Sequence, residues 1–265
     1  MDLGLRGHVA LVLGSSSGIG HACALELARE GARVMLCARD EERLRRAAAS
    51  LHEAGIEPAY VKTQVADVTQ ADAIAALPKR AYAAFGKVDI LVTNAGGPKA
   101  GRFEELTPED FEASVQLNLM SAIRATRAFI PRMVEQGWGR IVHLTSVSIR
   151  QPIDDLTVSN TVRSAFLGFT RSLATEYARH NVLVHNVCPG YTRTERLRHL
   201  EEHLSQTRGC TAAEVRAEWE TMIPAGRLAA PEEIAGLVAF LCSERASYLT
   251  GTTICVDGGL ARGIP

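Results

Sequence analysis

A glycine-rich loop between an apolar run and a helix-like segment constrains the fold of this chain more than any other feature. The run at 8–13 ends at the loop, residues 21–30 after it carry apolar side chains at helical spacing, and a second run covers 33–38. This order predicts a strand–helix–strand unit. The loop consists of Gly14, Ser15, Ser16, Ser17, Gly18, Ile19 and Gly20.

Each of the three loop glycines has its own physical role in such a unit. Gly14 lets the strand turn sharply, Gly18 leaves room for a pyrophosphate beside the backbone, and Gly20 allows close packing of the helix. The start of the helix offers free N–H groups and the positive end of its dipole to phosphates. The loop is therefore typical of a dinucleotide-binding site, and we expect all of its residues to bind the cofactor.

Apolar runs alternate with helical segments along the rest of the chain. The further runs lie at 59–63, 88–93, 141–145, 182–187 and 252–256, and the further helical segments at 41–54, 69–85, 109–136, 156–180, 195–221 and 231–243. Continuously apolar runs are typical of a parallel sheet covered on both faces by helices. Without a repeat or a linker, the sequence predicts one α/β domain over 1–265, a doubly wound Rossmann sheet of seven parallel strands.

Composition and charge exclude several classes of function. Apolar residues make up 46% of the chain, enough for a large core, and the net charge of −1 indicates no general attraction to nucleic acid or membranes. The N-terminus lacks a signal-peptide layout, and the scattered cysteines indicate reduced thiols in a cytoplasmic protein. His199 and His203 are spaced like metal ligands but lack a third partner, so we expect no metal.

Small and polar residues follow the expected strands at the edge where parallel sheets bind ligands. Arg39 ends the second strand, where an acid would bind ribose hydroxyls, and a guanidinium there favours NADP(H) over NAD(H) because it pairs with the 2′-phosphate. With the loop, we expect these residues to bind the cofactor: Arg39, Asp67, Val68, Asn94, Ala95, Gly96, Pro189, Gly190, Thr192 and Thr194.

The motifs together resemble the short-chain dehydrogenase/reductase family over essentially the whole chain, most of all the branch of 3-oxoacyl-carrier-protein reductases. The resemblance implies that Asp67 and Val68 bind the adenine, that 94–96 line the adenosine side, and that 189–194 hold the nicotinamide carboxamide. It also implies a helical substrate lid at about 195–224 and a homotetramer, or else a homodimer. The motifs are the glycine loop, Asp67-Val68, Asn94-Ala95-Gly96, Asn118, Ser146, Pro189-Gly190, Thr194 and Val256-Asp257-Gly258-Gly259.

The resemblance breaks at the family's catalytic Tyr-x-x-x-Lys motif. The spacing from Ser146 places Ser159 and Arg163 at those two positions, and the flanking residues still match the family. Serine is a far weaker acid than tyrosine, whose pKa is about 10, and arginine stays charged at any working pH. Arg163 can therefore stabilise an oxyanion or hold the cofactor ribose, but it relays protons poorly.

Catalytic and substrate residues follow from this comparison. We expect Asn118, Ser146, Ser159 and Arg163 to be catalytic, with Arg163 also contacting the cofactor and either Tyr191 or water supplying the proton. Tyr191 is equally well a wall of the pocket. Arg150 near the pocket mouth favours an anionic substrate, but it is equally well a surface arginine.

Three functions stay open on these residues. The first is an NADP(H)-dependent oxidoreductase that interconverts a carbonyl and an alcohol at an atypical site. The second is an NADP(H)-binding protein with little or no turnover, acting as a sensor or oligomer partner. The third is a relative that has lost the nucleotide, which the intact loop and Arg39 disfavour. The first is our expectation, with a small-molecule substrate.

Overall fold

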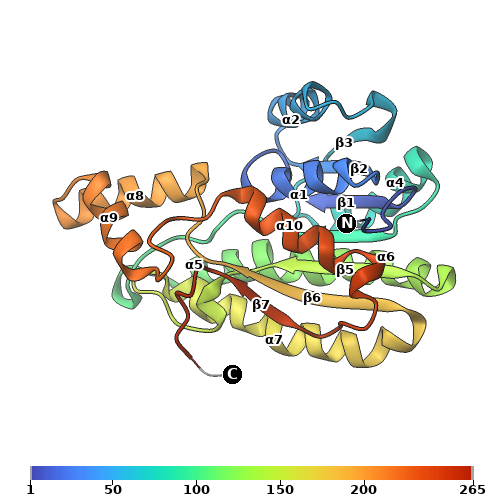
Figure 1. Ribbon diagram of the computed structural model, residues 1–265. Helices are drawn as coiled ribbons and strands as arrows, with labels where there is room; N and C mark the ends of the chain where they lie inside the picture. The colour runs from blue at the N-terminus through green and yellow to red at the C-terminus, as the bar shows by residue number, and fades with distance from the viewer. Residues whose placement is uncertain (1, 264–265) are drawn as a thin grey trace.

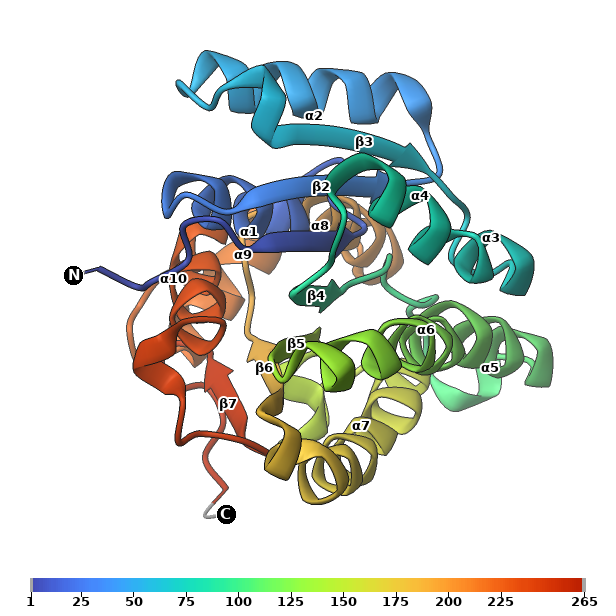
Figure 2. The same cartoon turned by 90° about the vertical axis from the view of Figure 1, so that its right-hand side faces the viewer.

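Seven parallel strands form one sheet in the computed structural model, which describes residues 2–263. The strand order is β3-β2-β1-β4-β5-β6-β7, as Figure 2 shows from the top of the view downward. The strands are β1 (Val9–Leu13), β2 (Arg33–Ala38), β3 (Val61–Val65), β4 (Ile90–Thr93), β5 (Gly139–Leu144), β6 (Val182–Pro189) and β7 (Thr253–Val256). The predicted fold class is confirmed, and each strand lies within two residues of its predicted bounds.

Helices cover both faces of this sheet, as the continuously apolar runs predict. The β1 strand is buried along its whole length, with apolar clusters on either side of it. Figures 1 and 2 show α1 and α10 on one side of the sheet and α6 and α7 on the other. The first layer holds α1 (Gly18–Arg29), α2 (Glu41–Glu53) and α10 (Pro231–Leu241), and the second holds α3 (Ala71–Ala75), α4 (Leu77–Phe85), α6 (Ser121–Gln136) and α7 (Thr157–Tyr177).

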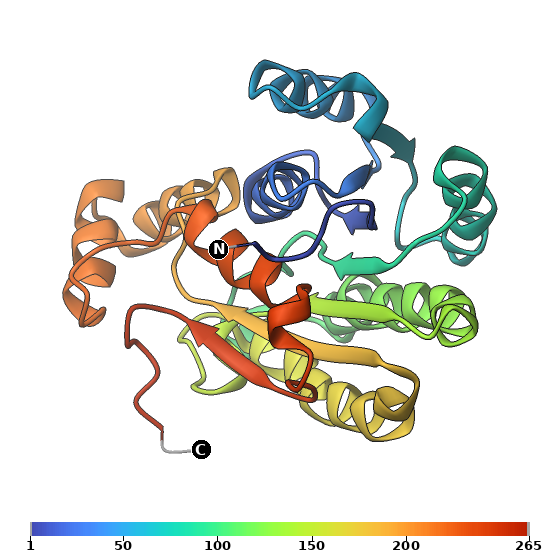
Figure 3. The same ribbon diagram turned by 45° about the vertical axis from the view of Figure 1, so that its right-hand side comes forward.

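Two more helices, α8 (Glu195–Arg208) and α9 (Ala212–Met222), lie beyond the carboxyl ends of the strands. They appear in orange in Figures 1 and 3, beside the sheet instead of on one of its faces. The sequence predicted one helical segment here, but Gly209 adopts a left-handed φ of +67° and ends α8. Thr211 then caps α9, accepting a hydrogen bond from the N–H of Glu214.

Two other segments predicted as continuous helices are also divided. The segment at 69–85 splits into α3 and α4, and Pro78, which has no N–H, stands in the first turn of α4. The segment at 109–136 contains α5 (Pro108–Ser114), a π-helical turn at Val115–Met120, and α6. Such π-helical turns are often found at functional sites, and this one contains the buried Asn118. Over residues 2–263, no helix is both long and apolar enough to cross a bilayer.

Two histidines are buried inside the sheet layers and stay neutral there. His143 on β5 shares a hydrogen bond of 2.8 Å with the Thr93 hydroxyl, and His185 on β6 shares one of 2.7 Å with the Thr252 hydroxyl. Burial lowers the pKa of His143 to about 3 and that of His185 to about 4.

Below pH 6.5 the unfolded chain therefore binds protons that the folded chain does not, and we expect its free energy of unfolding to fall from pH 7 to pH 5. Each histidine contributes at most about 1.4 kcal/mol per pH unit to this slope. Urea unfolding of wild type and of His143→Gln and His185→Gln measures it. The variants should show shallower slopes, and slopes equal to that of wild type would contradict the assignment.

Candidate active site

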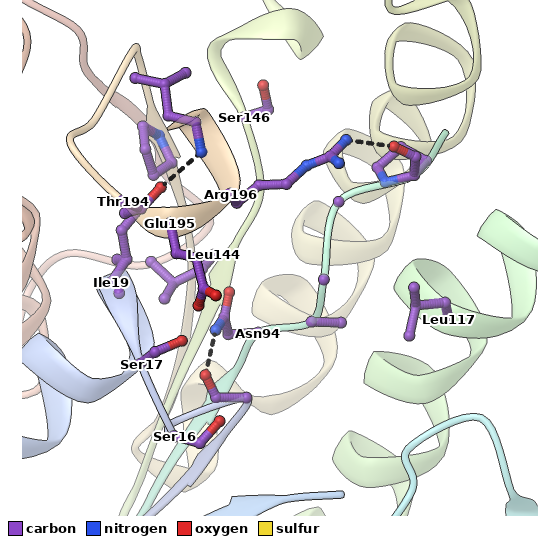
Figure 4. Close-up of a pocket in the computed structure, with 18 of the residues that line it drawn as sticks. Ser16, Ser17, Ile19, Asn94, Leu117, Leu144, Ser146, Thr194, Glu195 and Arg196 are labelled. Carbon is purple, nitrogen blue, oxygen red and sulfur yellow. Dashed lines mark hydrogen bonds between the residues drawn. The ribbon is translucent and has the colours of Figure 1, made fainter. Parts of the chain in front are cut away.

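A pocket of about 640 Å³ opens at the carboxyl ends of the strands, above the point between β1 and β4 where the strand order reverses. Open parallel sheets bind their ligands at this place. Figure 4 shows part of its walls, which come from the glycine loop, the ends of β4 and β5 and the start of α8. Residues of α7 also line the pocket. Among the predicted site residues, the pocket is lined by Gly14, Ser16, Ser17, Gly18, Ile19, Arg39, Asp67, Val68, Asn94, Ala95, Gly96, Ser146, Ser159, Arg163, Pro189, Gly190, Thr192 and Thr194.

The glycine loop owes its shape to close backbone contacts. Gly14 and Gly18 have φ angles of +60° and +59°, a region that residues with a Cβ atom rarely adopt. A Cβ on Gly20 would lie 2.5 Å from the Gly14 carbonyl oxygen and 2.7 Å from Asn94 Nδ2. The Asn94 amide donates a hydrogen bond of 3.0 Å to that same carbonyl. Gly20 therefore shapes the loop without lining the pocket.

Ser15 is fully buried below the loop and also does not line the pocket. Its hydroxyl donates to the Val12 carbonyl at 2.7 Å and accepts from the Cys37 N–H at 2.9 Å. These bonds join the end of β1 to β2. The Ser15 side chain therefore fixes the loop from below, and its contact with the cofactor stays a prediction.

One end of the pocket, at the ends of β2 and β3, carries two arginines. Arg39 is exposed there, as predicted from the sequence. Hydrogen bonds from Thr69 hold the pKa of Asp67 below its usual value, and the Arg39 charge acts in the same direction. Arg43 on α2 was missed; its guanidinium donates to the Ser17 hydroxyl at 3.2 Å and pairs with Glu195 of α8. The sequence did contain a signal for Arg43. Asp40 is a good N-cap residue, and the cap that it forms on α2 fixes which residues of the first turn face the loop.

The other end of the pocket, between β5 and α7, brings together Ser146, Ser159 and Arg163. Ser146 accepts a hydrogen bond of 3.1 Å from the N–H of Ser148, and the Ser148 hydroxyl lies 3.3 Å from that of Ser159. One helical turn further on, Arg163 donates from Nη1 to the Thr145 carbonyl at 2.5 Å. Burial lowers the pKa of Arg163 to about 10, and the Arg196 charge adds to the effect. The guanidinium still stays charged at neutral pH.

Asn118 does not line the pocket, although we expected it to be catalytic. From the π-helical turn, its Nδ2 donates to the Gly96 carbonyl at 2.8 Å, and its Oδ1 accepts from the Ser114 hydroxyl at 3.1 Å. Both functional atoms of the amide therefore bind protein. Asn118 therefore positions the segment after β4, and its catalytic role stays a prediction.

Tyr191 and Arg150 lie away from the main pocket. Tyr191 lines a second cavity of about 210 Å³, and its ring stacks on Trp219 of α9 at 4.6 Å between centroids. Burial raises its pKa to about 12. Arg150 is exposed and donates to the Thr253 carbonyl of β7 at 3.2 Å. Tyr191 thus forms a wall of the second cavity beside α9, the alternative that the sequence left open, and Arg150 is held at the β7 backbone. The substrate contacts expected of both residues stay predictions.

Arg196, which was not predicted from the sequence as a site residue, also lies in the main pocket. Arg196, in the first turn of α8, extends across it and donates from Nη2 to the Pro98 carbonyl at 2.6 Å. Figure 4 shows the guanidinium between Ser146 and the segment after β4. A Cβ on Gly97 would lie 2.6 Å from Arg196 Nε, so the side chain rests directly on that backbone.

Comparison with known proteins identifies the family. Residues 14–261 match the family model described as enoyl-(acyl carrier protein) reductase. The chain is 34% identical over 262 residues to the 3-oxoacyl-[acyl-carrier-protein] reductase FabG of Aquifex aeolicus, covering 98% of this chain and 100% of the relative. The chain therefore belongs to the short-chain dehydrogenase/reductase family, in its ketoreductase-like branch. It is an oxidoreductase that acts on CH–OH and C=O groups.

Solved structures agree with this assignment. The actinorhodin polyketide ketoreductase with NADPH superposes with a TM-score of 0.92 at 35% identity, covering 97% of this chain and 98% of that one. The L-sorbose reductase of Gluconobacter frateurii, complexed with NADPH and L-sorbose, has a TM-score of 0.92 and 35% identity over 100% of both chains.

Gly20→Ala tests the close contact at the base of the loop. We expect weaker coenzyme binding and a loss of about 1–3 kcal/mol of stability, because the added methyl group overpacks against Gly14 and Asn94. Thermal unfolding and NADPH fluorescence titration measure both effects. Gly236→Ala in α10, where a Cβ meets no atom within 4 Å, is the control and should bind normally. Equal behaviour of the two variants would rule out the steric role of Gly20.

Proposed function

We propose that this enzyme interconverts a carbonyl and an alcohol with NADP(H), using serine hydroxyls and a fixed guanidinium in place of a phenol and an amine. The observation that carries the proposal is the position of Arg163. Its Nη1 reaches the end of β5 at Thr145, in the same pocket wall as Ser146 and Ser159. A carbonyl that accepts hydride develops negative charge on its oxygen, and a preorganised cation with adjacent hydroxyl donors stabilises that charge.

The pocket fits an NADP(H) molecule in its shape and its charges. The left-handed glycines of the loop and the start of α1 suit the pyrophosphate. Arg39 and Arg43, at the β2–β3 end, suit the 2′-phosphate, since guanidinium forks pair with phosphate oxygens. Asp67 and Val68 would hold the adenine. When bound, NADPH supplies the hydride.

Further residues would hold the rest of the coenzyme. The segment 94–96 would line its adenosine side, and Pro189, Gly190, Thr192 and Thr194 would hold the carboxamide end. Thr194 also begins α8, where its hydroxyl accepts from the Leu197 N–H at 3.2 Å. A Cβ on Gly18 would lie 3.3 Å from the Thr194 side chain, so the loop and the start of α8 frame a narrow passage.

The proton source is the part of the chemistry that departs from the family resemblance. Among residues 2–263, no tyrosine or lysine lines the main pocket. A serine hydroxyl is a weak acid, and Arg163, with a pKa of about 10, is poorly suited to relay protons. We therefore assign the proton to water that enters through the pocket. The same observation supports the second candidate function, an NADP(H)-binding protein with little turnover.

The surrounding architecture completes the proposal. The chain forms a single domain, and α8 with α9 serves as a substrate lid. The first turn of α8 contacts both sides of the pocket. Glu195 forms an ion pair with Arg43, and Arg196 donates a hydrogen bond to the Pro98 carbonyl. The family resemblance supports a homotetramer, or else a homodimer, which light scattering distinguishes from a monomer.

Coenzyme preference tests the role of the arginines. We expect NADPH to bind more tightly than NADH, and Arg39→Ala and Arg43→Ala each to reduce the preference by about tenfold, through loss of a charge-assisted hydrogen bond. Fluorescence titration gives the four pairs of dissociation constants, with Arg45→Ala on the outer face of α2 as the control. Equal affinities in wild type would remove the role given to Arg39.

Restoring the family's motif tests the active site. Ser159→Tyr with Arg163→Lys should raise carbonyl reduction by about 10²-fold or more, since a positioned general acid contributes that much. Steady-state rates over a panel of carbonyl compounds measure the change, and Arg163→Lys alone serves as the control. A double variant that folds, binds NADPH and reduces nothing in the panel would show that the pocket is not built for hydride transfer.

A further inference from the structure

The β5–α7 end of the pocket contains two guanidinium groups and no carboxylate. Arg163 enters from α7 and Arg196 from α8. Three carboxylates line other parts of the pocket, and each has a partner there. Asp40 caps α2, Asp67 accepts from Thr69, and Glu195 pairs with Arg43.

Neither arginine is paired with an acid within residues 2–263. Arg163 donates to the Thr145 carbonyl, and Arg196 donates to the Pro98 carbonyl. Arg163 Nε is buried and has no hydrogen-bond partner in that part of the chain. Backbone carbonyls satisfy donors but do not neutralise charge, so two positive charges face one cavity.

Other arginines of the lid show that this arrangement is specific to the pocket. Arg198, Arg208 and Arg216 each form an ion pair with a carboxylate of the α8–α9 segment, namely Glu202, Glu218 and Glu201. Arg196 is the arginine of α8 that instead enters the pocket. Its charge acts on Arg163, whose pKa it helps to lower. A bound anion would remove this repulsion between like charges.

We propose that the substrate carries an anionic group, a carboxylate or a phosphate, beside its carbonyl, and that Arg196 binds that anion. The inference rests on the proposed carbonyl reduction and names its substrate class. Arg163 is fixed to β5 and faces the reacting oxygen. Arg196 is exposed and held by one carbonyl, so its fork can turn to bind a carboxylate or phosphate through two hydrogen bonds.

Matched charged and neutral probes test the anion site on the full-length, NADPH-loaded protein. Acetoacetate and acetoacetamide form the carboxylate pair, and dihydroxyacetone phosphate and dihydroxyacetone form the phosphate pair. Binding by calorimetry and kcat/KM are measured at constant ionic strength. We expect wild type to favour the charged member of at least one pair by about tenfold, the scale of a hydrogen bond to a charged group. The pair that shows the preference identifies the anion.

Three variants test whether Arg196 causes the preference for charged probes. Arg196→Gln should lose the preference, Arg196→Lys should partly restore it, and Arg198→Gln, on the same helix but outside the pocket, should keep it. Equal binding of charged and neutral probes by wild type overturns the inference. So does a preference that persists in Arg196→Gln. If Arg196→Gln weakens NADPH binding as much as probe binding, the arginine belongs to the coenzyme and the inference is likewise overturned.

The experiment also separates this inference from the proposed function. Acetoacetate binding that depends on Arg196, without turnover of any probe, would support the anion site and contradict the reductase function. Turnover of neutral carbonyls with no dependence on Arg196 would do the reverse.

Discussion

The structure depends on the contact between the end of β1 and the end of β4. There the Asn94 side chain donates to the Gly14 carbonyl, and Gly20 packs so closely that a Cβ would overlap both groups. The strand order reverses here, so the segments that follow β1 and β4 lead to opposite faces of the sheet. A crevice opens between those two segments. The hydrogen bond fixes the width of that crevice. Every other part of the site is placed relative to this one junction.

Charge is distributed along the crevice in two separate groups. The β2–β3 end has Arg39 and Arg43, and the β5–α7 end has Arg163 and Arg196. Both cations of the second group are guanidiniums, and arginine does not release its proton at working pH, so this end of the crevice stays positively charged. In the proposed mechanism this end therefore relies on fixed positive charge, which stabilises an oxyanion, more than on an acid that delivers a proton.

The sequence predicts well the features that are determined locally, and poorly those that depend on how the α8–α9 segment packs. Strand ends, the glycine loop and the place of Arg39 at the end of the second strand follow from short-range patterns. The meeting of Ser146 with Ser159 and Arg163 was expected from the family resemblance alone. The division of 195–221 into two helices also had a local signal in Gly209. The positions of Tyr191 and Arg196 had none, since the first is set by stacking on Trp219 and the second by the direction in which α8 leaves β6.

The start of α8 connects the two groups of charge to each other. Glu195 and Arg196 are adjacent in the first turn of α8, yet they attach to opposite sides of the pocket, one to Arg43 on α2 and one to Pro98 after β4. Under the two proposals, a phosphate bound by Arg43 would compete with Glu195, and an anion bound by Arg196 would compete with the Pro98 carbonyl. Each ligand would thus release one attachment of the same helical turn. Because coupling between sites is reciprocal, we expect the proposed coenzyme and the proposed anion to affect each other's affinity through this helical turn.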